Sequence, residues 1–197
     1  MNYEEIFAAS AVYQTRRFGE FKIMVALGND INREHLVLVR GDVADARDVL
    51  CRVASRCVTS TALDASDCDC SGQIDRAMRL IDRADRGILI YLDQEGRGNG
   101  IVNKVKAMNG KRRGLDTFEA VEELGLPADN RGYKEAAQLI HALGPMSIAL
   151  LTNNIEKLQA LRDQGIVIAD MIPCIAIDPP VEAQRHLDAK RARGHTL

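Results

Sequence analysis

One short apolar run constrains the fold of this chain more than any other feature. The run Gly87–Leu92 reads Gly-Ile-Leu-Ile-Tyr-Leu and carries no charge, which predicts a strand that is buried on both faces. It leads directly into residues 93–100, a loop rich in glycine and charge. Ligands of α/β proteins bind beyond the carboxyl ends of such strands. The sequence therefore predicts an α/β fold with a ligand site at this loop.

The remaining apolar patterns predict how this strand is flanked. Further strands are expected at residues 20–27, 35–40, 49–55, 146–151 and 166–172, and helices at 72–84, 101–108, 117–124, 133–143 and 155–164. The last strand, helix and strand form a βαβ-like series. We expect a mixed α/β (α+β) chain whose residues 1–197 form one compact domain, a mixed sheet flanked by helices. The polar and basic residues 185–197 are expected to form a flexible tail.

Composition argues against several classes of partner. The net charge of -2 and the 4% aromatic content give no footprint for nucleic acid. No apolar run reaches the roughly 18 residues of a membrane span. The first residues also lack the basic start and apolar middle of a signal peptide. We therefore expect a cytoplasmic protein that binds neither nucleic acid nor membrane.

Three clustered cysteines are the strongest chemical signal in the chain. Cys57, Cys68 and Cys70 follow a C-x10-C-x-C spacing, just after the strand expected at 49–55. In a reducing compartment such a cluster points to a metal site rather than to disulfides. Structural zinc has four protein ligands, whereas catalytic zinc has three and keeps one position for water. The two cysteines outside the cluster, Cys51 and Cys174, are expected to be buried free thiols.

The sequence favours an open zinc site but leaves two alternatives. A distant histidine could close the site as a fourth ligand, although none lies within 15 residues of the cluster; the four histidines are His35, His141, His186 and His195. The thiols could also carry no metal, but the polar character of the loop argues against this alternative. An open site would give zinc a water whose pKa falls to about 7.

Two further segments are candidates for binding an anion. Glu95 and Arg97 lie in the glycine-rich loop, which matches neither a P-loop nor a dinucleotide fingerprint and which, alone, could be a solvated turn. Thr152 follows the strand expected at 146–151, and Lys157 lies one turn into the next helix, an arrangement suited to phosphate. The alternative there is simple helix capping by Asn153 or Asn154.

In order along the chain, these segments resemble the GTP cyclohydrolase II family in its single-domain form. Nearly the whole chain takes part, through Arg52-Val53, Cys57, Cys68-Asp69-Cys70, Gln73, Tyr91, Gln94-Glu95-Gly96-Arg97, Asn103-Lys104, Gly114, Asp116-Thr117, Leu124-Gly125, Asp129, Arg131, Leu151-Thr152-Asn153-Asn154 and Lys157. Without the resemblance, Asp129 and Arg131 would predict only a polar loop.

The resemblance implies that GTP is the substrate and that hydroxide supplied at one Zn²⁺ ion attacks C8 of guanine. Formate and, with the help of Mg²⁺, pyrophosphate are then released. Cys57, Cys68 and Cys70 would bind the zinc, Asp129 would accept a proton, and Arg131 would attack the α-phosphate. We interpret Arg131 more conservatively as a phosphate clamp, because arginine stays protonated. The positions that match GTP-binding residues are Arg52, Gln73, Glu95, Arg97, Thr117, Thr152 and Lys157. The family is typically homodimeric.

The chain departs from the family pattern near the cluster. Ala54 and Arg56 stand where the family usually has His and Glu, and Met108 replaces a tyrosine near the reacting centre. A thioether cannot donate a proton as a phenol does. We therefore expect ring opening with the formyl group retained. The alternatives are the standard enzyme, which releases formate for riboflavin synthesis, a non-catalytic purine-nucleotide sensor on the same fold, and a closed structural zinc module.

Overall fold

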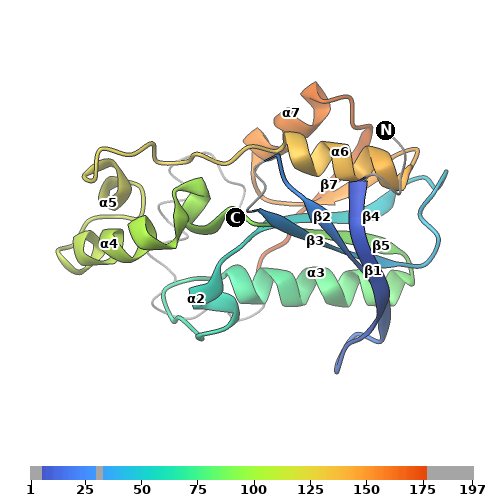
Figure 1. The fold of residues 1–197 in the computed structure, drawn as a ribbon, viewed down its shortest axis with the longest axis horizontal. Helices are drawn as coiled ribbons and strands as arrows, with labels where there is room; N and C mark the ends of the chain where they lie inside the picture. The colour runs from blue at the N-terminus through green and yellow to red at the C-terminus, as the bar shows by residue number, and fades with distance from the viewer. Residues whose placement is uncertain (1–5, 30–32, 177–197) are drawn as a thin grey trace.

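The fold is a seven-stranded mixed sheet with helices on both faces (Figure 1). The structure, a computed structural model, describes residues 6–29 and 33–176. The strand order is β1-β2-β3-β5-β4-β6-β7. The strands are β1 (Phe7–Gln14), β2 (Glu20–Leu27), β3 (Glu34–Arg40), β4 (Val49–Ser55), β5 (Gly87–Leu92), β6 (Ile148–Leu151) and β7 (Ile168–Ile172).

One half of the sheet is antiparallel and the other half is parallel. Strands β1, β2, β3 and β5 pair antiparallel in that order. Strands β5, β4, β6 and β7 pair parallel. The carboxyl ends of the four parallel strands therefore meet at one edge of the sheet. The loops that leave this edge carry most of the residues discussed below.

Helices cover the two faces of the sheet unequally. Helix α3 (Cys70–Ala84) lies on one face, and α6 (Lys134–Leu143) and α7 (Ile155–Asp163) lie on the other (Figure 1). Helix α3 buries Ala77, Met78 and Ile81 against the first face. The apolar residues of α6 join the larger core on the opposite face. This burial on both faces explains why β5 is apolar throughout.

A small helical arm extends beyond the edge of the sheet (Figure 1). It contains α4 (Gly100–Arg112) and α5 (Glu119–Glu122), which pack through Ala107, Ala120 and Val121. The short helix η1 (Glu95–Gly98) connects β5 to the arm, and α2 (Val58–Thr61) follows β4. The arm and the sheet edge form the two sides of the candidate site.

The structure confirms the predicted fold class and corrects several bounds. Strands β2, β4 and β5 match the prediction, and β6–α7–β7 is a parallel βαβ unit. Strand β1, α2 and η1 were not predicted, and α4 is longer and α5 shorter than expected. The predicted tail at 185–197 lies outside the described residues. Among the described helices, none has the length and apolar character to cross a membrane.

Candidate active site

A pocket lies between the sheet edge and the helical arm. It is lined by side chains from β4, the cysteine segment, α3, the 93–100 loop, α4 and the residues after β6. Asp129 does not line the pocket but pairs with Arg131, which does. The predicted site residues that line it are Arg52, Ala54, Arg56, Cys57, Cys68, Cys70, Gln73, Glu95, Arg97, Met108, Thr117, Arg131, Thr152 and Lys157.

The three cysteines converge as a metal site requires. Cys57 follows the end of β4, and Cys70 begins α3. The Cys57 and Cys68 sulfurs are 3.7 Å apart, and all three sulfurs lie within 4.8 Å of one another. Tetrahedral zinc with Zn–S bonds of about 2.3 Å places sulfurs ~3.8 Å apart, so the donor set fits zinc.

In the described part of the chain, no other histidine, cysteine or carboxylate belongs to this group. His35 lies beside Glu135, and His141 contacts the carbonyl of Gln164. His186 and His195 fall outside the described residues. The described residues therefore offer a metal three sulfur ligands.

Electrostatics distinguish the cluster from the other thiols. Hydrogen bonds from Cys68 and Cys70 lower the pKa of Cys57, and Lys104 acts in the same direction. The same hydrogen bonds raise the pKa values of Cys68 and Cys70, so a metal that binds all three displaces protons. Burial raises the pKa of Cys51 to about 12, and Cys174 is also a buried free thiol, as predicted.

Glu95 and Lys104 form an ion pair beside the cluster. Lys104 Nζ lies 2.8 Å from Glu95 Oε1 and 3.1 Å from Cys57 Sγ. Glu95 also accepts the backbone N–H groups of Gly96 at 3.0 Å and Val58 at 2.7 Å. Lys104 was quoted in the resemblance, but no role was predicted for it. Lys104, Ala107, Met108 and Lys111 follow helical spacing and so share one face of α4, the face that lines the pocket. This spacing could have identified Lys104 from the sequence.

A buried polar chain forms the floor of the pocket. Arg52 donates through Nη1 to the Leu151 carbonyl at 2.8 Å and through Nη2 to Gln73 Oε1 at 2.6 Å. Gln73 donates in turn to Asp69 Oδ2 at 2.6 Å. The buried Nε of Arg52 has no hydrogen-bond partner among the described residues. A guanidinium fixed in this way has a donor left for an anion.

Lys157 is a buried cation beside this floor. Its side chain is 5% exposed, and Nζ donates to the Val53 carbonyl at 2.6 Å. Burial lowers the pKa of Lys157 far below its usual value, and the charge of Arg52 adds to the effect. Asn154 caps α7 by accepting the Lys157 N–H, so the capping interpretation is confirmed for Asn154. Capping involves the backbone of Lys157 and leaves the ammonium at the pocket wall.

The glycine-rich loop packs against the segment that carries Asp129 and Arg131. Asn130 donates to the Arg97 carbonyl at 2.9 Å. Gly98 has a φ of +82°, and a Cβ there would lie 2.5 Å from the Asn130 carbonyl, so only glycine permits this approach. Glu95 is buried, and therefore the interpretation of this loop as a solvated turn is wrong.

Arg131 and Asp129 form an ion pair in which each group favours the charged form of the other. Burial alone would lower the pKa of Arg131, but the hydrogen bonds that it donates to Asp129 raise it overall. Burial alone would raise the pKa of Asp129, but its hydrogen bonds with Arg131 and the charge of Arg131 lower it overall. Arg97 stacks on Phe118, and burial together with the charge of Arg131 lowers its pKa to about 10.

The lining of the pocket is strongly cationic. Seven of its side chains are basic and two are acidic: Arg52, Arg56, Arg97, Lys104, Lys111, Arg131 and Lys157 against Asp67 and Glu95. Asp93, Glu95, Asp67 and Asp129 pair with Arg56, Lys104, Lys111 and Arg131. Arg52, Arg97 and Lys157 have no carboxylate partner among the described residues, so they favour an anionic ligand.

Comparison with known proteins agrees with this site. A sequence model described as GTP cyclohydrolase II matches residues 6–173. GTP cyclohydrolase-2 of Picrophilus torridus is 44% identical over 91% of this chain and 93% of its own length. The chain belongs to the GTP cyclohydrolase II family. GTP cyclohydrolase-2 of Pseudomonas syringae pv. tomato is also 44% identical, over 85% of this chain and 82% of its own length.

The riboflavin biosynthesis protein RibBA of Chlorobium phaeovibrioides is 40% identical over 91% of this chain. The match covers 44% of that longer protein.

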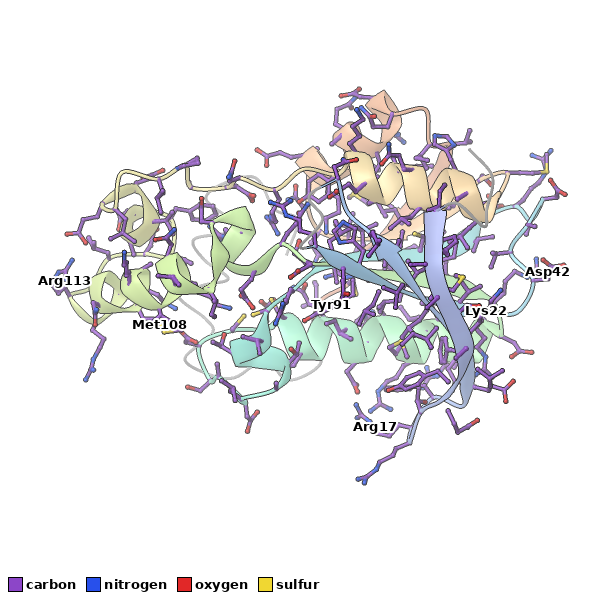
Figure 2. The ribbon with its side chains drawn as sticks, viewed as in Figure 1. Arg17, Lys22, Asp42, Tyr91, Met108 and Arg113 are labelled. Atoms are coloured by element: carbon purple, nitrogen blue, oxygen red, sulfur yellow. The ribbon has the colours of Figure 1, made fainter. Side chains whose placement is uncertain are left out.

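The departures from the GTP cyclohydrolase II pattern gather on two sides of the pocket. Met108 is half-buried on α4 and lines the pocket from the helical arm (Figure 2). Ala54 is buried at the end of β4, and Arg56 is held at the rim by Asp93, with Nη1 3.0 Å from Oδ1. Arg56 therefore both lines the pocket and reaches solvent.

Proposed function

We propose that this protein opens the imidazole ring of GTP at C8 by zinc-dependent hydrolysis, with loss of pyrophosphate and retention of the formyl group. The observation that carries the proposal is the presence of three converging thiols and a cationic floor in one pocket. When bound, zinc lowers the pKa of water to about 7 and so supplies a nucleophile at neutral pH. Cys57, Cys68 and Cys70 would hold it.

The cationic residues would hold the triphosphate. Arg52, Arg97 and Lys157 are buried or constrained donors, and Thr117, Thr152 and Gln73 add polar groups to the pocket lining. Mg²⁺ would assist pyrophosphate release, as in the resemblance. Because Asp129 raises the pKa of Arg131, a neutral, nucleophilic guanidine is disfavoured, and the clamp role for Arg131 is the better proposal. Asp129 remains the proposed proton acceptor.

Met108 determines the proposed product. Hydrolysis that breaks the C8–N9 bond leaves the formyl group on N7, and a second hydrolysis at C8 would release formate. A thioether can neither donate a proton nor orient water as a phenol does. We therefore propose 2-amino-5-formylamino-6-ribosylamino-pyrimidinone 5'-phosphate as the product.

A direct product assay tests the reaction. The protein is incubated with GTP, Zn²⁺ and Mg²⁺, and product masses and free formate are measured. We expect pyrophosphate and the formylated pyrimidinone, without stoichiometric formate. Release of one formate per GTP would instead identify the standard reaction of riboflavin synthesis. Nucleotide binding without turnover by the zinc-loaded protein would favour the sensor, although a sensor needs no thiol cluster. We also propose a homodimer in the cytoplasm, where the thiols stay reduced.

Replacing Lys157 with methionine should stabilise the nucleotide-free protein. Burying a charge costs several kcal/mol in lost hydration. We expect a net gain of only about 1 kcal/mol from its removal, because the Val53 carbonyl then loses its donor. Folding lowers the pKa of this lysine, so its energetic cost is complete below the lowered pKa and disappears as the pH approaches about 10.4. In urea unfolding, the gain should be larger near neutral pH than at about pH 10.

The same variant should bind GTP about 10- to 100-fold more weakly, since it loses a charge-assisted hydrogen bond to phosphate. Titration calorimetry measures this loss. Lys134→Met removes an equal charge from an exposed position at the start of α6 and serves as the control. A Lys157→Met protein that is less stable and binds GTP unchanged would contradict a phosphate role for this residue.

A further inference from the structure

We propose that Lys104 is a positioning residue for the metal centre, held by Glu95 so that its ammonium donates to the sulfur of Cys57. The inference rests on the metal-binding part of the proposed function. It assigns Glu95 to the support of Lys104, whereas the resemblance implies that Glu95 binds GTP.

The contacts of Glu95 leave it little capacity for guanine. An ionised carboxylate has about four acceptor positions. Oε1 already accepts from Lys104 at 2.8 Å and from the Gly96 N–H at 3.0 Å, and Oε2 accepts from the Val58 N–H at 2.7 Å. Recognition of guanine through N1–H and the amino group would need one free position on each oxygen. Only Oε2 has one left.

The same contacts place Lys104 firmly against the cluster. The Glu95 side chain is 8% exposed and ties α4 to the backbone that follows Cys57. Lys104 Nζ then lies 3.1 Å from Cys57 Sγ. A charge pair shielded from solvent in this way is screened little by salt. The pair therefore connects the helical arm to one specific metal ligand.

The chemistry explains why a cation is useful at this sulfur. Three thiolates around a divalent ion carry a net negative charge, and strong sulfur donation weakens the ion as a Lewis acid. Hydrogen bonds from outside the ligand set tune the electron donation of metal ligands. An ammonium at Cys57 withdraws density from that sulfur and offsets the extra charge. Removal of Lys104 should make Cys57 a stronger donor.

Cobalt substitution makes this effect visible without any nucleotide. Co²⁺ replaces zinc in the purified protein, and the sulfur-to-cobalt charge-transfer band is recorded for wild type and Lys104→Met. We expect the band to move to longer wavelength in the variant. Lys106→Met, an exposed lysine on the same helix, should leave the band unchanged. With zinc, Lys104→Met should lower kcat about 10- to 100-fold, the usual effect of such outer groups, with little change in KM.

Glu95→Gln separates the two roles of the carboxylate and provides a second variant if Lys104→Met folds poorly. Loss of its charge should shift the cobalt band in the same direction and lower kcat. An unchanged band with a higher KM for GTP would show that Glu95 binds guanine, and it would overturn the proposal, as would an unshifted band in Lys104→Met. A Lys104-dependent band in a protein that does not turn over GTP would refute only the proposed reaction.

Discussion

Replacing Cys68 with serine should reduce GTP turnover by more than about 100-fold, because even loss of a group outside the ligand set costs 10- to 100-fold. The variant would leave two thiolates to hold the ion, and metal content should fall with activity. The fold should remain, since Cys68 is only partly buried and the two large cores lie elsewhere. Turnover, bound zinc and far-ultraviolet circular dichroism measure the three outcomes.

Cys51→Ala is the matched control for this experiment. Cys51 on β4 is fully buried in the larger core, which α6 covers, so its loss should cost some stability but neither zinc nor turnover. If Cys68→Ser kept full activity, the cluster would not be catalytic. If it unfolded the protein together with metal loss, the cluster would be the structural zinc module that the sequence left open.

Replacing Met108 with tyrosine should convert a formyl-retaining enzyme into one that releases formate. Met108 lies on the pocket face of α4, one turn after Lys104. A tyrosine at this position would add a hydroxyl beside the proposed reacting centre. We expect formate to rise from a trace toward one per GTP consumed, while ring opening continues. Product masses and a formate assay on the same sample measure both steps.

Met146→Tyr makes the same chemical change at an exposed position outside the pocket, and its product should match that of the wild type. Stoichiometric formate from the unmodified protein would remove the argument from Met108. A Met108→Tyr protein that still retains the formyl group would show that further residues, such as Ala54, are also needed for deformylation.

Local sequence patterns predicted every strand of the sheet except β1, the outer strand of its antiparallel half. Strands such as β5 carry uninterrupted apolar side chains because helices cover both of their faces. Strand β1 was missed because nearly all of it is exposed at the sheet edge, including Val12 and Tyr13, so it shows no alternation of buried and exposed residues. The predicted loop position at the carboxyl edge followed from general topology and agrees with the pocket.

Local patterns predicted the thiol cluster and the candidate phosphate-binding segment at Thr152 and Lys157. They did not predict the long-range contacts of the site. Asp129 and Arg131 were found through the family resemblance alone, because their packing on Arg97 depends on a loop about 30 residues away. Lys104 acquires its partners from η1, which follows β5, and from the segment after β4. Such long-range pairs have no periodic signature, so only the folded chain reveals them.

The most direct test of the account is X-ray absorption at the zinc edge of the nucleotide-free protein. We expect one zinc per chain, with three sulfur neighbours at about 2.3 Å and one water oxygen at about 2.0 Å. A fourth nitrogen or sulfur donor from the protein, or a preparation that binds no zinc when its thiols are reduced, would contradict it.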